Sequence, residues 1–184
     1  MIRFAKEEDL PQILEIYGPY VLNTCYSFEY NVPTLEEFTQ RFREITRQFP
    51  WLVWEENGLV LGYAYGSAPF SRDAYRWSAE SSIYLAPEAQ GKGIGRKLYA
   101  ALEELLTAQG YHKTYAIITT ANEPSLAFHK AVGFRFVASM PECGYKFGQL
   151  HGITWMEKIL TFHTFYDRFP RLIREIVNTY RKFQ

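Results

Sequence analysis

The chain has 184 residues, which matches one domain with a short appendage. With 47% hydrophobic and 22% charged residues it is not an intrinsically disordered chain, and at this length a core forms without a metal or disulfide staple. Twenty basic and 20 acidic residues give zero formal net charge, so the chain as a whole is not expected to bind nucleic acid by neutralising phosphates.

The N-terminal residues and the two cysteines indicate in which cellular compartment the protein is found. Residues 1–9 contain no apolar signal region, and no apolar run approaches the roughly 18 residues that a membrane span needs. Cys25 and Cys143 are too few for a disulfide framework, and without an export signal they are expected to stay reduced. We therefore expect a cytoplasmic protein without a membrane span.

Strands and helices alternate along residues 1–159. Apolar periodicity, a capping box from Thr34 to Glu37 and an Asn57-Gly58 hairpin turn set their bounds. Strands are expected at 2–5, 51–55, 59–66, 77–85, 112–119, 134–140 and 153–158, and helices at 8–21, 35–47, 91–109 and 124–132. This order predicts an α/β (α+β) fold with a mixed central β-sheet flanked by helices.

Aromatic residues make up 17% of the chain, which is a high fraction. A core and a dimer interface rich in rings account for it, and so does a ligand pocket walled by rings. The two interpretations are compatible.

Residues 160–184 differ from the rest in charge, with five basic and two acidic residues against 15 and 18 in residues 1–159. We expect a domain over residues 1–160 and a C-terminal helical extension over residues 161–184, with Pro170 in the first helical turn. The extension is expected to dock on its own domain or on a sister subunit, although a basic amphipathic helix also suits an anionic membrane. Its apolar stripe consists of Leu172, Ile173, Ile176, Val177, Tyr180 and Phe183.

The most informative segment is a glycine-rich turn between a strand and a helix, Gln90-Gly91-Lys92-Gly93-Ile94-Gly95-Arg96. Alternate glycines let successive backbone N–H groups point the same way, and a helix N-terminus adds positive potential. The segment therefore predicts a pyrophosphate-binding turn with Lys92 and Arg96 at its rim. The alternative is a glycine-rich turn without a ligand.

Two other phosphate-binding motifs do not fit this segment. The dinucleotide fingerprint Gly-x-Gly-x-x-Gly needs a glycine where the chain has Arg96. The P-loop needs Gly-Lys followed by Ser or Thr, which is also absent.

The turn resembles the acyl-CoA pyrophosphate loop of the GCN5-related N-acetyltransferases, the GNAT superfamily, and the resemblance covers about residues 1–159. Further segments are similar to the phosphinothricin/methionine sulfoximine acetyltransferase subgroup: Trp77–Leu85, Asn122–Ser125 with His129, Gly133-Phe134 and Gly144–Gly148. The resemblance implies the GNAT fold, acetyl-CoA as co-substrate and transfer of its acetyl group to an amine.

In that fold the strand before the turn splays from its neighbour, and the pantetheine arm fills the gap. The resemblance implies that the backbone there binds pantetheine and that the N–H of Leu85 polarises the thioester carbonyl. Asn122 bonds the same arm or caps the next helix, and these two roles stay open. The cofactor-binding residues expected are Ile83, Tyr84, Leu85, Gln90, Gly91, Lys92, Gly93, Ile94, Gly95, Arg96, Asn122 and Ser125.

Two residues map onto the family's proton-transfer positions. Glu80 corresponds to the general base, which is required because an amine of pKa about 9–10 is mostly protonated at pH 7. It is otherwise a polar strand carboxylate that faces solvent. His129 stands where many members have a tyrosine general acid and would protonate the leaving thiolate. It is otherwise a structural histidine on a helix face.

The subgroup implies acceptor-binding residues in two places, Arg72 with Tyr75 and Phe28 with Glu29. Arg72 would pair with a carboxylate or phosphinate, or it is a solvated loop charge. Where the subgroup continues with Trp-x-Asp, this chain has Leu150-His151-Gly152, so the acidic group is missing. The histidine replaces it or is merely exposed.

We therefore expect an acetyl-CoA-dependent N-acetyltransferase that acetylates a small amino-acid-like amine, of the phosphinothricin or methionine sulfoximine/sulfone type, by direct attack in a ternary complex. The alternatives are a non-catalytic acyl-CoA-sensing module and an acetyltransferase for a protein, peptide or polyamine. A homodimer is expected. A metal is not, because the four histidines show no ligand spacing with the cysteines.

Overall fold

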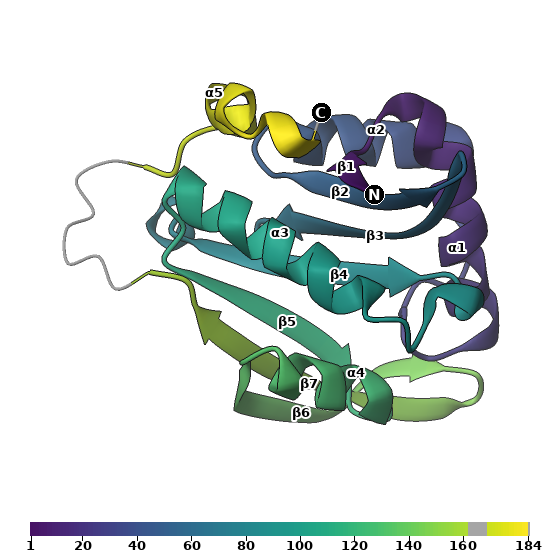
Figure 1. The fold of residues 1–184 in the computed structure, drawn as a ribbon. Coiled ribbons are helices and arrows are strands. Elements are labelled where there is room, and N and C mark those ends of the chain that lie inside the picture. The colour runs from purple at the N-terminus through teal and green to yellow at the C-terminus, as the bar shows by residue number, and fades with distance from the viewer. Residues whose placement is uncertain (162–168, 184) are drawn as a thin grey trace.

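A seven-stranded sheet runs through the molecule in the computed structural model, which describes residues 1–161 and 169–183 (Figure 1). The strand order is β1-β2-β3-β4-β5-β7-β6, and every neighbouring pair is antiparallel except β4 and β5. The mixed sheet expected from the sequence is thus confirmed. The strands are β1 Ile2–Phe4, β2 Trp51–Glu56, β3 Leu59–Ser67, β4 Ser78–Leu85, β5 Lys113–Thr119, β6 Arg135–Lys146 and β7 Gln149–Ile159.

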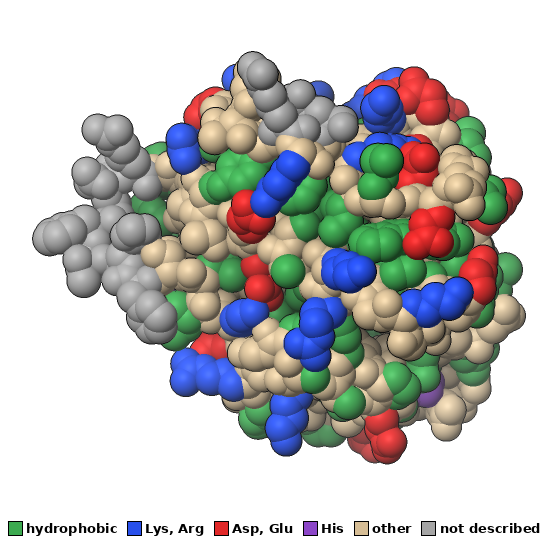
Figure 2. All heavy atoms as spheres, in the orientation of Figure 1, with side chains coloured by type: hydrophobic (Ala, Val, Ile, Leu, Met, Phe, Trp, Pro, Cys, Tyr) green, Lys and Arg blue, Asp and Glu red, His purple; other side chains and the backbone are tan. Residues whose placement is uncertain are grey.

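Helices cover both faces of this sheet (Figure 1). Helix α3 crosses one face, and α1 and α2 pack on the other. On the face that carries α3, basic and acidic side chains are interspersed (Figure 2). Among the residues described, no helix combines the length and apolarity needed to cross a bilayer. The helices are α1 Leu10–Asn23, α2 Leu35–Thr46, α3 Ile94–Gln109, α4 Glu123–Ala131 and α5 Ile173–Ile176.

Two hairpins, β2–β3 and β6–β7, are closed by two-residue turns with positive φ angles. Asn57 and Gly58 have φ of 52° and 81°, so the predicted turn between β2 and β3 is confirmed. Phe147 and Gly148 have φ of 49° and 78° and close a second two-residue turn between β6 and β7. Because this turn is so tight, both strands extend well past the bounds predicted for them, and a register shift between Met140 and Gly144 absorbs the irregular middle of β6.

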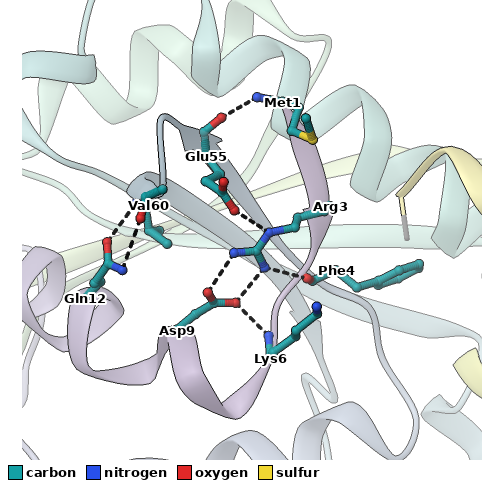
Figure 3. A network of polar contacts seen from close by, with 9 residues as sticks. Met1, Arg3, Phe4, Lys6, Asp9, Gln12, Glu55 and Val60 are labelled. Carbon is teal, nitrogen blue, oxygen red and sulfur yellow. Dashed lines mark hydrogen bonds and ion pairs between the residues drawn. The ribbon is translucent and has the colours of Figure 1, made fainter.

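A polar network fastens the N-terminus to the sheet (Figure 3). The guanidinium of Arg3 makes two bonds of 2.7 Å to the carboxylate of Asp9 and one of 2.6 Å to Glu55. Burial alone would raise the pKa of Asp9, but the bonds from Arg3 and from the backbone N–H of Lys6 outweigh it and lower the pKa. The network fixes β1 and the start of α1 against β2.

Most of the aromatic excess lies in the core. Trp51 stacks on Tyr65 with ring centroids 4.1 Å apart, and Tyr63 continues the stack. The face that α1 covers adds Tyr17 and Tyr84, whose rings meet edge to face at 5.0 Å. Tyr84 belongs to β4, the strand that also carries Glu80, so the ring-rich core continues into the wall of the site.

The C-terminal segment docks on its own chain, as one of the two expected arrangements had it. Ile173, Ile176 and Phe183 are buried, and Phe183 packs edge to face on Phe4. The side chain of Gln109 donates to the carbonyl of Arg171 at 2.8 Å.

The continuous helix expected from Pro170 is wrong in detail, since the segment forms α5 and then 3-10 turns at Val177–Thr179 and Arg181–Phe183. Asn178 and Thr179, which favour turns over helix interiors, lie where the helical turn ends. Residues 162–168 and 184 of the predicted extension lie outside the described residues. The division into a domain and an extension stays a prediction.

A chain that ends at Leu160 should lose several kcal/mol of stability, because three buried apolar side chains are worth about 1.5–3 kcal/mol each before entropy costs. Its melting temperature should fall by roughly 10 °C on the scaling for chains of this size, with exposure of the apolar surface around Phe4. Calorimetry of both proteins tests this. An unchanged melting temperature and elution volume would mean that the segment is a loose appendage.

Candidate active site

Strands β4 and β5 separate partway along their length. They pair only from Ser78 to Glu80, opposite Lys113 to Tyr115, whereas β5 continues to pair with β7 as far as Thr119. The two ribbons diverge beyond this point (Figure 1). Glu80 therefore lies at the apex of a gap, and the rest of β4 has a free edge toward β5.

The hydrogen-bond alternation of an antiparallel pair tells which β4 backbone groups face this gap. The N–H of Ala86 donates to Leu61 at 3.0 Å, so in the β3–β4 register Tyr84 also bonds to β3. Ile83 and Leu85, one residue out of phase, direct their N–H and C=O groups away from β3. The carbonyl of Leu85 accepts from the hydroxyl of Tyr20 at 2.7 Å. Of the three residues expected to bind pantetheine, Ile83 and Leu85 therefore have backbone groups that face the gap. The backbone groups of Tyr84 are used in bonds to β3.

A cavity of about 460 Å³ occupies the gap. It brings together nine of the predicted cofactor and catalytic residues, from β4 to helix α4. The other five, Glu80, Lys92, Gly93, Ile94 and Arg96, are not part of its wall. Sequence reasoning missed the rest of the wall. The lining is Tyr20, Tyr26, Ser81, Ser82, Ile83, Tyr84, Leu85, Gln90, Gly91, Gly95, Ala116, Ile117, Ile118, Thr119, Asn122, Pro124, Ser125, Phe128 and His129.

The glycine turn forms the end of the cavity. Gly91 and Gly93 have φ of 72° and 76°, and a Cβ on either would meet open space. Helix α3 starts immediately afterwards, so its first N–H groups lack helical acceptors and point out of the helix. Lys92 and Arg96 are exposed beside it, whereas the side chain of Ile94 is buried in the core and offers the turn only its backbone.

Glu80 is the ionisable group at the apex. Its carboxylate makes no hydrogen bond to any described group, and burial raises its pKa above the ordinary value. It shares its face of the sheet with Ser82 and Tyr84, on the side of α1 and away from α3. This half-buried position differs from the solvent-facing carboxylate that was the alternative interpretation.

His129 is buried, and both of its ring nitrogens are used. Nδ1 lies 2.7 Å from the carbonyl of Ser125, which only accepts, so Nδ1 carries the proton. Nε2 therefore accepts from the hydroxyl of Tyr99, also at 2.7 Å. Burial lowers the pKa of His129, which keeps the ring neutral. This geometry favours the structural interpretation of His129 over direct proton donation.

Asn122 caps helix α4, since its side-chain oxygen accepts from the N–H of Ser125 at 3.2 Å. Both residues also line the cavity. The cap uses the oxygen of the Asn122 amide, so its NH₂ group is the part left for a ligand. The two roles weighed for this residue are therefore compatible.

The residues expected at the acceptor lie in two separate places. Phe28 and Glu29 line a second, shallower pocket with Arg41, whose guanidinium bonds Glu29 at 2.7 Å. Arg72 and Tyr75 lie in the exposed loop before β4, outside both pockets, with Tyr75 against Phe70. His151 is 9% exposed, so the exposed position considered for it is wrong; its Nε2 bonds the carbonyl of Lys146.

The site combines three features: a gap beside a parallel strand pair, a glycine turn on a helix N-terminus at its end, and a half-buried carboxylate at its apex. Together they define an acyl-CoA-dependent acyltransferase. Residues 2–155 match the acetyltransferase (GNAT) domain family. The chain belongs to this family and is an acetyltransferase whose co-substrate is acetyl-CoA.

Similar proteins have been named for related activities. The chain is 38% identical to L-methionine sulfoximine/L-methionine sulfone acetyltransferase of Salmonella typhimurium, over 88% of this chain and 95% of that protein. It is 38% identical to L-amino acid N-acyltransferase MnaT of Escherichia coli, over 85% and 91%. A phosphinothricin acetyltransferase from Sinorhizobium meliloti, solved with acetyl-CoA, is 40% identical with a TM-score of 0.85, over 89% and 90%.

These similarities bear on the alternatives considered from the sequence. A non-catalytic sensing module and an enzyme for protein or polyamine acceptors are not favoured, since the named relatives above are enzymes for small amine substrates. No group of three or more His, Cys, Asp or Glu residues that would hold a metal occurs in residues 1–161 and 169–183.

Replacing Gly93 with valine should weaken acetyl-CoA binding at least about tenfold, or about 1.4 kcal/mol. A β-branched side chain at φ of 76° forces the turn out of shape and blocks the approach of a phosphate to its backbone. The measurement is calorimetric titration of acetyl-CoA.

Gly58→Val is the matched control, because Gly58 has φ of 81°, open space around its Cβ and a place in the remote β2–β3 turn. It should lower the melting temperature comparably and leave the affinity unchanged. Equal affinity in wild type and Gly93→Val would contradict the assignment of this turn.

Proposed function

We propose that the protein transfers the acetyl group of acetyl-CoA to the amino group of a small amino-acid-like acceptor, of the type of phosphinothricin, methionine sulfoximine and methionine sulfone, by direct attack in a ternary complex. The observation that carries the proposal is Glu80 at the apex of the β4–β5 gap. Its carboxylate has no hydrogen-bond partner in the part of the chain that the structure describes, and burial raises its pKa. The names of the relatives support the class of acceptor.

The donor half of the site is proposed to lie along β4 and the glycine turn. The turn and the start of α3 would hold the pyrophosphate, with Lys92 and Arg96 adding positive charge from the rim. Ile83 and Leu85 would bond the pantetheine arm through their backbone, and the NH₂ group of Asn122 would bond it from the other wall of the cavity. When bound, acetyl-CoA supplies an activated thioester.

Glu80 is proposed to accept the proton of the acceptor ammonium, directly or through a water. A raised pKa makes the carboxylate a stronger base and brings its proton affinity closer to that of the amine. The N–H of Leu85 is proposed to stabilise the negative charge that develops on the thioester oxygen. The amine nitrogen would form the amide bond as the C–S bond breaks, and the leaving thiolate would take up the second proton that the nitrogen loses, directly or through water. Neutral His129 is proposed to hold Tyr99 and the start of α4 in place.

On the acceptor side, Phe28 and Glu29 are proposed to contact the substrate. Arg72 and Tyr75, in their exposed loop, are proposed to close over it, with Arg72 pairing with its acidic end. The ion pair between Glu29 and Arg41 supports a polar acceptor there, because it leaves one oxygen of Glu29 buried without a hydrogen-bond partner among the described residues.

A panel of amines tests the proposed function. Purified protein is incubated with acetyl-CoA and phosphinothricin, methionine sulfoximine, methionine sulfone, unmodified methionine, a polyamine or a short peptide, and released CoA thiol is measured. Turnover is expected with the first three and not with the last two. Turnover with the peptide or polyamine alone, or with no amine, would overturn the assignment.

Glu80→Gln should lower kcat by about 10²–10⁴ with little change in the KM for acetyl-CoA. The loss of kcat should shrink at alkaline pH, where free amine is abundant.

The same variant should also change the pH dependence of stability. Because the folded protein raises the pKa of Glu80, the ionised carboxylate destabilises the fold above that pKa. This destabilisation disappears as the pH falls below the pKa that Glu80 has in the unfolded chain. The variant should thus melt higher than wild type at pH 8 and equally at pH 4. An undiminished kcat would remove Glu80 from the mechanism.

We further propose a cytoplasmic homodimer in which the β6–β7 hairpin forms the contact. Residues 135–143 are all exposed, and large apolar side chains of the hairpin are exposed with them. Exposed apolar side chains that gather on one element are typical of protein contacts. Free Cys25 and Cys143 suit a reducing compartment. The exposed apolar side chains are Phe136, Val137, Met140, Tyr145, Phe147 and Leu150.

Phe136→Glu should convert this dimer into monomers, because it places a charge in an apolar contact. Sedimentation velocity of wild type and variant measures the change. Leu59→Glu, at an equally exposed leucine in the β2–β3 hairpin, is the control and should remain dimeric. A monomeric wild type would contradict the assembly.

A further inference from the structure

Lys146, at the end of β6, is a buried lysine whose ammonium group contacts no carboxylate among the described residues. Its Nζ donates to the carbonyls of Val21, Thr24 and Ser27 at 2.6, 3.0 and 2.7 Å. Three bonds use all three N–H groups of the ammonium. The side chain is 2% exposed, so this is a closed arrangement that solvent does not complete.

The three carbonyls belong to the C-terminal end of α1 and the turn that follows it. The last carbonyls of a helix lack helical donors and carry partial negative charge, which a cation there offsets. Burial lowers the pKa of Lys146 and outweighs the opposing influence of the nearby Cys25 and Glu29. The three carbonyls satisfy the hydrogen-bonding capacity of the ammonium group. Lys146 thus fastens the segment 24–29 to the β6–β7 hairpin, more than 100 residues away in the chain.

The hairpin shapes the same segment at a second point. Phe28 lies directly on Gly144, where a Cβ would come within 2.3 Å of its ring. The ring of His151 lies 6.3 Å from that of Phe28, and the same histidine bonds the backbone of Lys146. From the other side, Thr119 at the end of β5 donates to the carbonyl of Cys25 at 2.8 Å.

The segment held in this way carries Glu29. One oxygen of Glu29 bonds Arg41, and the other, Oε2, is buried without a hydrogen-bond partner in the described residues. Burial is the main reason that the pKa of Tyr65 is raised, and both Glu29 and Glu80 raise it further, so this phenol lies within electrostatic range of both carboxylates. An unpaired carboxylate oxygen in such a place is complementary to a primary ammonium group.

We propose that Lys146 is a positioning residue for the acceptor: it holds the segment 24–29 so that the unpaired oxygen of Glu29 and the ring of Phe28 meet the amino group and the adjacent carbon chain of the amino-acid substrate. This inference rests on the proposed function, and it assigns acceptor affinity to a lysine that touches neither substrate. The glycine turn and the β4 backbone of the donor site lie on other elements, and from the segment 24–29 it is Tyr26 that borders the donor cavity.

Lys146→Met tests the inference, since methionine fills a similar volume without a donor. The KM for the best acceptor of the panel should rise at least about tenfold, while the calorimetric Kd for acetyl-CoA stays within about twofold of wild type. Lys158→Met is the matched control. Lys158 also donates to a carbonyl, that of Val132 at 2.7 Å, but it lies beside α3 and α4, so its loss should lower the melting temperature without changing the KM of the acceptor.

Gly144→Ala provides a second variant that keeps the lysine. Its methyl group displaces the ring of Phe28, so it should also raise the KM of the acceptor and leave the Kd for acetyl-CoA unchanged. If Lys146→Met fails to fold, this variant decides the question. An acceptor KM within twofold of wild type, or an equal loss of acetyl-CoA affinity, would overturn the inference.

Hydrogen exchange separates this inference from the proposed function, because it requires no turnover. Amides of residues 24–29 should exchange faster in Lys146→Met than in Lys158→Met. Exchange that is no faster would overturn the inference whichever acceptor is used. A wild-type enzyme that acetylates none of the amino-acid amines would instead contradict the proposed function, while the exchange result would still decide whether Lys146 holds the segment.

Discussion

The free edge of β4 is the constraint on which the rest of the structure depends. A strand that stops pairing inside a sheet exposes backbone donors and acceptors that are costly to bury without partners. Here Ile83 and Leu85 direct such groups into a cavity, and Tyr20 satisfies one of them. The parallel pairing with β5 holds the strands together only as far as Glu80. The unpaired backbone is therefore confined to the place where an extended ligand supplies the missing bonds.

At the apex of the gap, the position that raises the pKa of Glu80 and makes it a stronger base also lowers the stability of the fold. A carboxylate in a half-buried place beside tyrosine rings is harder to ionise, and the folded protein bears that cost. In the N-terminal network, by contrast, the carboxylates are compensated, since the planar guanidinium of Arg3 bonds both Asp9 and Glu55. The desolvated carboxylate of Glu80 thus differs from Asp9 and Glu55, whose charges Arg3 compensates.

Local patterns in the sequence predicted most of the fold and part of the site. The Asn57-Gly58 turn, the capping box at Thr34 and the glycine turn before α3 each depend on residues close in the chain, and the structure has all of these elements. The length of the β6–β7 hairpin was missed, because Phe147 is not a residue that favours φ above zero. The helical extension was overestimated, because its apolar spacing also suits short turns packed on a core.

The walls of the site that come from distant elements had no local signal. Ala116–Thr119 line the cavity only because β5 is the parallel neighbour of β4, and Tyr20 reaches it only through the packing of α1. The state of His129 depends on Tyr99, one helix away, so spacing along the chain does not reveal that both ring nitrogens are used. Such facts arise from tertiary contacts and become visible only when the chain is folded.

The contact between Phe4 and Phe183 joins two segments that lie far apart in the chain. A contact of such large sequence separation closes a long loop, and the entropy of that closure is lost before the contact contributes any stability. The docking of this segment against β1 is therefore expected to form late in folding, on a surface that the central strands have already assembled. The cover over β1 is in consequence the part of the core whose formation depends most on the remainder being in place.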